Sequence, residues 1–137
     1  MKRSVLAALL VLPLLGSDSP KQYDDAAQEA GIEGDWSPIW TEWAGRISPE
    51  KPDQLYSYHA GQFRWTTGQT EGTYVVDRRY HPARLTEQTA NKNSTFRNVF
   101  QIDGSILRVG YLESGSGYPT GFNDKRPMTI EVYRRVR

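Results

Sequence analysis

The chain has 137 residues, with 17 basic and 16 acidic side chains and no cysteine. This length predicts a single domain, and the missing cysteine excludes disulfides, thiol catalysis and cysteine-ligated metal sites. The near-neutral charge is unlike that of nucleic-acid-binding proteins, which carry a basic excess that neutralises phosphates.

Residues 1–19 have the pattern of an export signal peptide, in which Lys2 and Arg3 precede an apolar run. This run is shorter than the roughly 20 apolar residues that a membrane-spanning helix needs. Ser17 and Ser19 are small residues at the two positions that a signal peptidase inspects, which favours cleavage after Ser19. We therefore expect an exported protein, periplasmic or extracellular, with no stable membrane anchor after cleavage.

Residues 20–33 are expected to form a short lead-in, either helical or disordered. Two aspartates, several alanines and Gly31 suggest a helix that ends in a glycine cap. Its apolar face is thin, so the main domain is predicted to span residues 34–137.

From Gly34 onward, aromatic and β-branched runs alternate with Gly, Pro, Asn and Asp, which is typical of antiparallel strands joined by turns. The pattern predicts eight strands, which are Asp35–Trp43, Gln54–His59, Gln62–Thr67, Gly72–Asp77, Arg84–Thr89, Phe96–Ile102, Ile106–Leu112 and Met128–Arg135. Tight turns are expected at Ala60–Gly61 and Asp103–Gly104, and the longest connections at 47–53 and 114–127.

Eight strands without intervening helices predict an all-β barrel or sandwich. We favour an eight-stranded antiparallel barrel, because closing the sheet removes the exposed edges that would otherwise promote aggregation.

Side chains alternate between the two faces of a strand, so Trp36, Pro38 and Trp40 are expected to share one face. On the last strand the same rule groups Arg134 with two core aliphatics, Ile130 and Val132. Because a guanidinium is almost never buried without a partner, we expect Arg134 to stack on Trp36 and close one end of the barrel.

Two further expectations follow from this closure. Gly34 would leave space for the arriving final strand, and Glu131, Tyr133 and Arg135 would face the solvent.

A glycine and a tryptophan at the start of the first strand, with an arginine on the last, resemble the lipocalin and wider calycin pattern. More specifically, the chain resembles a small lipocalin-like domain of unknown function found in planctomycete bacteria. The matching stretches, in order, are GDW at 34–36, EGTYVVD at 71–77, HPARL at 81–85, FQIDGSILRVGY at 100–111, YPTGF at 118–122 and IEVYRRV at 130–136. The resemblance implies an eight-stranded barrel, and no established activity or ligand.

No combination of residues in the sequence indicates catalysis, a cofactor or a metal. His59 adjoins a predicted turn and His81 precedes a proline in a predicted loop, so both are expected at the surface. A hydrolytic site would require one of them to lie close to a serine and a carboxylate, and no local signature of such a site is present. We therefore expect a protein that is not an enzyme.

The aromatic residues exceed what is needed to close one end of a barrel. An eight-stranded barrel is just wide enough to be filled by side chains or to hold one small ligand. If the interior is hollow, the residues expected to line the cup are Trp40, Tyr56, Tyr58, Phe63, Trp65, Phe100 and Tyr111.

Two functional hypotheses remain open from the sequence. The first is a barrel that binds a small apolar or amphipathic ligand in its cup. The alternative is a filled barrel that displays loops 47–53 and 114–127 to a protein partner. An internal cavity would distinguish the two.

Overall fold

The computed structural model describes residues 31–50, 54–66, 69–114 and 117–136. The predicted signal peptide and most of the predicted lead-in lie outside these ranges. Within them the structure has nine strands, which are β2 (Gly34–Trp43), β3 (Arg46–Pro49), β4 (Tyr56–His59), β5 (Gln62–Trp65), β6 (Thr70–Asp77), β7 (Ala83–Thr89), β8 (Thr95–Asp103), β9 (Ile106–Leu112) and β10 (Met128–Arg135). No helix in the described ranges is long and apolar enough to span a membrane.

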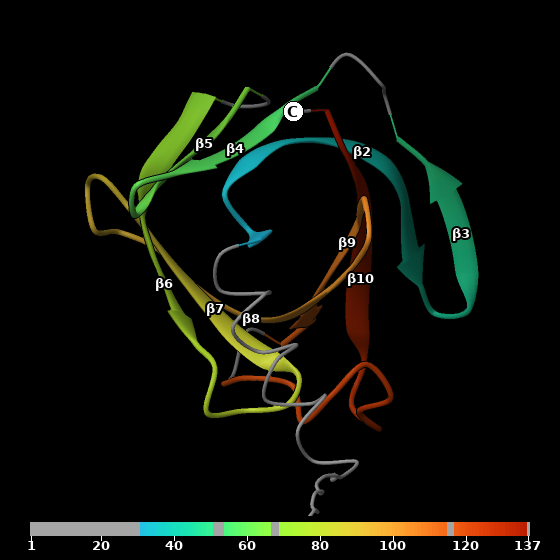
Figure 1. The fold of residues 1–137 in the computed structure, drawn as a ribbon. Helices are drawn as coiled ribbons and strands as arrows, with labels where there is room; N and C mark the ends of the chain where they lie inside the picture. The colour runs from blue at the N-terminus through green and yellow to red at the C-terminus, as the bar shows by residue number, and fades with distance from the viewer. Residues whose placement is uncertain (1–30, 51–53, 67–68, 115–116, 137) are drawn as a thin grey trace, which may run out of the picture.

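Eight of the strands form a closed antiparallel barrel. Each strand from β4 to β10 pairs with its neighbour in the chain, β4 pairs with β2, and β10 pairs with β2 to complete the ring. Figure 1 shows this ring with β2 and β10 adjacent at the closure. The predicted eight-stranded barrel is therefore confirmed.

The ninth strand, β3, lies outside the ring, and the sequence did not predict it. It forms a hairpin with the second half of β2, where Trp40 pairs with Pro49 and Trp43 with Arg46. All four residues of β3 are exposed, and in Figure 1 the strand projects from the side of the barrel. The sequence analysis placed a long connection at 47–53, which contains Pro49 and Pro52, and β3 overlaps its beginning.

The predicted turn at Ala60–Gly61 is confirmed, whereas the β8–β9 turn lies one residue later than predicted, at Gly104 and Ser105. Asp103 pairs with Ile106 across a two-residue turn in which Gly104 has φ of 62°. Ala60 and Gly61 have φ of 51° and 80°. These left-handed conformations favour glycine, which explains why the local sequence identifies the turns.

A β-bulge in β2 changes which side chains face the barrel interior. Val132 pairs with Trp40 and the next residue, Tyr133, pairs with Pro38, so Ile39 is the extra residue. Paired residues share a face, and Tyr133 belongs to the buried core. Trp36 and Pro38 therefore face inward, whereas Trp40 faces outward, and its predicted place in the cup is wrong.

The last strand has the opposite orientation to the one predicted. Glu131 and Tyr133 pair with inward residues of β9, which places Ile130, Val132 and Arg134 on the outer face. Ile130 and Val132 are nevertheless buried there, because the outer surface carries its own apolar packing near Gly110, where Met128 and Phe122 approach. This second apolar layer made the outer face look like the core face in the sequence.

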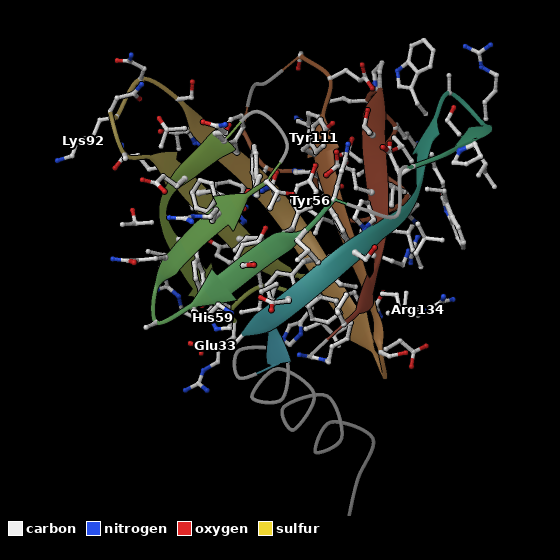
Figure 2. The ribbon with its side chains drawn as sticks, turned by 90° about the horizontal axis from the view of Figure 1, so that it is seen from above. Glu33, Tyr56, His59, Lys92, Tyr111 and Arg134 are labelled. Carbon is white, nitrogen blue, oxygen red and sulfur yellow. The ribbon has the colours of Figure 1, made fainter. Side chains whose placement is uncertain are left out.

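The barrel is closed at one end by Trp36 and Arg135, rather than by Arg134. The Arg135 guanidinium carbon lies 4.2 Å from the centroid of the Trp36 ring. Arg135 also donates hydrogen bonds to the carbonyl oxygens of Gly31 (2.5 Å) and Glu33 (2.9 Å). Arg134 is exposed, and Figure 2 shows its side chain directed away from the barrel. The predicted stacking of an arginine on Trp36 is present, but the arginine is Arg135 and not its neighbour Arg134.

The segment just before β2 is part of the closure. Ile32 is fully buried, and its carbonyl accepts a hydrogen bond from Nε1 of Trp36 at 2.9 Å. Gly34 is buried with φ of 136°, a conformation that residues with a side chain rarely adopt. The backbone conformation at this position therefore requires a glycine. The core thus extends upstream of the predicted domain boundary at residue 34.

Candidate functional site

The half of the barrel away from Trp36 encloses a cavity of about 240 Å³. Its rim includes Thr95 at the start of β8, Leu112 at the end of β9, and Gly117 in the β9–β10 connection. The aromatic residues that line it are Tyr56, Tyr58, Trp65, Phe96, Tyr111 and Tyr133. Figure 2 shows Tyr56 and Tyr111 among the side chains that gather between the strands.

Four of the seven residues predicted for the cup line this cavity, namely Tyr56, Tyr58, Trp65 and Tyr111. Phe63 and Phe100 instead belong to the buried core cluster and do not line the cavity. Trp40 lies on the outer face, where its Nε1 donates a hydrogen bond to Glu42 at 2.9 Å. The prediction therefore identified four of the six aromatic wall residues, missed Phe96 and Tyr133, and included two residues that fill the core.

The aromatic walls form a connected set of ring contacts. The Tyr56 ring centroid lies 4.9 Å from that of Tyr133 and 5.6 Å from that of Trp65. The Trp65 ring is 5.3 Å from Phe96 and 5.1 Å from Phe63. These tilted contacts hold the rings against one another, so the aromatic walls of the cavity are packed together.

One carboxyl group, that of Glu87 on β7, is buried in the cavity wall with a residue exposure of 2%. It accepts hydrogen bonds from the Tyr58 hydroxyl (2.6 Å) and from Nδ2 of Asn98 (2.8 Å). Burial raises the pKa of Glu87 to about 7, even though these hydrogen bonds act in the opposite direction. Glu87 therefore exchanges its proton close to neutral pH.

A second carboxyl group, that of Glu131 on β10, lines the same cavity. The Tyr133 hydroxyl donates a hydrogen bond to it at 2.5 Å, and the Tyr111 hydroxyl lies 3.5 Å from its other oxygen. Burial also raises the pKa of Glu131, and the negative charge of Glu131 contributes to the raised pKa of Glu87. The two carboxyl groups thus interact across the cavity.

The indole N–H of Trp65 is buried without a hydrogen-bond partner among the described residues. It lies near enough to Glu87 to lower the pKa of that carboxyl, although burial dominates. A buried donor without a partner loses free energy relative to one exposed to water. The cavity wall therefore contains an indole N–H that could donate a hydrogen bond to a ligand.

The sequence analysis missed Glu87, Asn98 and Glu131. A signal for Glu87 was present, because Ala83, Leu85 and Glu87 alternate along one strand and share its inward face. Glu131 was assigned to solvent because the aliphatic residues on either side of it seemed to define the core face.

The β9–β10 connection is packed against the outside of the barrel near the rim. Tyr118 forms a 2.6 Å hydrogen bond with Thr86, and its ring lies 4.2 Å from the Arg84 guanidinium. Asp124 accepts hydrogen bonds from Arg126 at 2.7 to 3.0 Å and holds the turn together. The side chains of this connection therefore hold it against the outer face of β7.

The two histidines lie apart from the cavity. His59 is exposed at the β4–β5 turn, with Nε2 3.0 Å from a carboxylate oxygen of Asp35. His81 is exposed in the connection between β6 and β7. In the described part of the chain, no group of three or more His, Asp or Glu residues could hold a metal ion.

Chemically, the cavity combines flat aromatic surfaces with two acidic groups whose pKa values are raised by burial. It can accept hydrogen bonds through the carboxyl groups and can balance positive charge. Comparison of the chain with protein-family models, with curated proteins and with solved structures finds no significant match in any of the three.

Proposed function

We propose that this protein binds a small amphipathic molecule inside the barrel. The observation that carries the proposal is the cavity of about 240 Å³, which has aromatic walls and a few convergent polar groups. Small-molecule sites generally have this composition.

The size of the cavity limits the ligand. Pockets for drug-sized molecules enclose about 300–1,000 Å³, and this cavity is smaller. A long acyl chain or a fused polycyclic molecule would not fit inside it. The ligand is therefore a compact molecule with one apolar part and one polar part.

The packing of the β9–β10 connection favours ligand binding over display of this loop to a protein. Tyr118 and Phe122 turn toward the barrel, where Phe122 lies 4.3 Å from the Arg108 guanidinium. A loop that contacts a partner would be expected to present its large apolar side chains to solvent. This connection instead uses them to brace the barrel wall.

The proposal is tested by blocking the cavity. Val109 lines it, so Val109→Phe should fill part of the space and abolish binding of a neutral probe, benzyl alcohol, measured by NMR titration. The matched control is Val75→Phe, since Val75 is 66% exposed on the outer face of β6. Equal binding to both variants, or no binding to the native protein, would overturn the proposal.

We also propose that the protein is exported and that residues 1–19 are removed. The support is the basic start, the apolar run and the small residues before Pro20. Mass spectrometry of protein recovered outside the cytoplasm should give an N-terminus at Pro20. Recovery of the intact chain from the membrane fraction would contradict cleavage.

A further inference from the structure

The carboxylates of the cavity lack a basic partner within the described structure. No Lys, Arg or His there forms an ion pair with Glu87 or Glu131. Arg97, the basic residue among those that line the cavity, is exposed on β8. Buried charges in proteins are normally paired, because an unpaired charge loses its hydration without compensation. When these carboxyl groups are ionised, the described part of the protein therefore supplies no positive charge to balance them.

Glu131 is the carboxyl group that acts on most of the other groups of the cavity. In its ionised form it contributes to raising the pKa of five of them, Tyr56, Tyr58, Glu87, Tyr111 and Tyr133. The partners of Glu131 are two neutral hydroxyls, those of Tyr133 and Tyr111. Neutral donors reduce the cost of burying a carboxylate but do not cancel its charge.

The aromatic rings around this charge also favour a cation. Tyr56 contacts both Trp65 and Tyr133, and all three rings line the cavity with Glu131. The face of an aromatic ring attracts a cation within about 6 Å of its centroid, most strongly when the cation is desolvated. The aromatic rings and the Glu131 carboxylate would thus both attract a cation bound in the cavity.

We propose that the ligand is a small organic ammonium ion, held by the Glu131 carboxylate and the rings of Tyr56, Trp65 and Tyr133. This inference rests on the proposed function and specifies its ligand class. Glu87 lies on the same cavity as a second acceptor for the ammonium N–H groups. The hydrogen bonds from Tyr58 and Asn98 favour the ionised form of Glu87, although burial raises its pKa to about 7.

The lining favours an organic cation over a metal ion. A bare metal ion needs several oxygen or nitrogen ligands at short distances, and aromatic rings do not supply them. In the ranges that the structure covers, no cluster of three such side chains is present. An ammonium ion with an apolar substituent uses both the carboxylate and the rings.

The test compares three probes of nearly equal size, benzylamine, benzyl alcohol and benzoate, by NMR titration at neutral pH. Benzylamine should bind the native protein at least about tenfold more tightly than benzyl alcohol. Benzoate should bind more weakly than either, because its charge repels that of Glu131. Equal affinity for the amine and the alcohol, or a preference for benzoate, would overturn the inference.

Single-residue variants test whether the preference for benzylamine depends on Glu131. Glu131→Gln should weaken benzylamine binding by about tenfold or more and leave benzyl alcohol binding within about twofold. The matched control is Glu71→Gln, since Glu71 lies in an exposed ion pair with Arg64. If Glu131→Gln does not fold, benzylamine binding to Glu87→Gln is measured instead. The three-probe comparison on the native protein then still tests the preference for ammonium.

Failure of this inference is distinguishable from failure of the proposed function. Binding of all three probes with similar affinity, blocked by Val109→Phe, would leave the cavity a ligand site and exclude preference for ammonium. Binding of none of them would overturn both. Loss of benzylamine preference in Glu131→Gln alone, with Glu71→Gln unchanged, would support the inference.

Discussion

The two ends of the barrel are built from the same strands but differ in how their interiors are filled. At the closed end, Trp36, Phe100 and Leu107 are fully buried, and the polar atoms of Trp36 and Arg135 have partners. At the other end, the interior is hollow, and it contains Glu87 at 2% exposure and a Trp65 N–H that has no hydrogen-bond partner in the part of the chain that the structure describes. One end is packed as a protein core, and the other has the properties of a binding site.

This difference shows where the barrel gains its stability. Side chains that interdigitate gain contacts and exclude water, whereas an unfilled cavity loses contacts around its lining. A chain without cysteine cannot compensate for the loss with disulfides. The closed end must therefore supply the stability that allows the other end to remain hollow.

The largest expected effect is at the closed end. Trp36→Ala should reduce the free energy of unfolding by about 3–5 kcal/mol, because it removes a fully buried ring and leaves a cavity. Urea denaturation measures this change. The control is Trp43→Ala on the β2–β3 hairpin, where the side chain is 45% exposed and the loss should stay below about 1 kcal/mol. Equal losses would contradict the assignment of the core.

The next effect concerns pH at the hollow end. The pKa of Glu87 rises from 4.5 to about 7 on folding, so the folded protein holds this proton more tightly than the unfolded chain does. Stability should therefore fall as pH rises through this window, by about 3 kcal/mol for this group. Glu87→Gln should flatten the dependence, although Glu131 titrates in the same cavity. If the pH dependence of stability is the same in Glu87→Gln as in the native protein, Glu87 is not buried as described.

A smaller effect separates the two neighbouring arginines. Arg135→Ala should cost about 1–3 kcal/mol, since it removes the stack on Trp36 and two hydrogen bonds. Arg134→Ala should change stability by less than about 0.5 kcal/mol, because its side chain is exposed. A double-mutant cycle between Arg135→Ala and Trp36→Ala should give a coupling of about 0.5–2 kcal/mol. Coupling of Trp36 to Arg134 instead would restore the register expected from the sequence.

The smallest effect has the opposite sign. Val109→Phe, which blocks the cavity, should raise the free energy of unfolding by about 0.5–1 kcal/mol because it fills empty space. Differential scanning calorimetry detects the change as a higher melting temperature. A loss of stability would mean that this end is already closely packed.

Much of the barrel follows from local sequence signals. The apolar run of Ile106–Leu112 and the glycine at position 104 indicate a hairpin without reference to the rest of the fold. The bulge at Ile39 has no comparable signal, because it arises where β2 must pair with β10 on one side and with two strands on the other. Its effect was large, since a shift of one residue moves each following side chain to the other face.

The site was harder to predict than the fold. Tyr56, Tyr58 and Trp65 were identified because aromatic residues in short strands are expected to point inward. Glu87 and Glu131 were missed because a charged residue in a strand is normally assigned to the solvent face. Only the closed barrel shows that both carboxyl groups face the same cavity.

The most direct test of the account is an NMR titration of the Glu87 side-chain carboxyl carbon in the folded protein without added ligand. A midpoint close to pH 7 would show a carboxyl group enclosed in the barrel and surrounded by its tyrosine and asparagine partners. A midpoint near 4.5, the ordinary value for glutamate, would show a hydrated carboxyl group and would contradict the enclosed cavity.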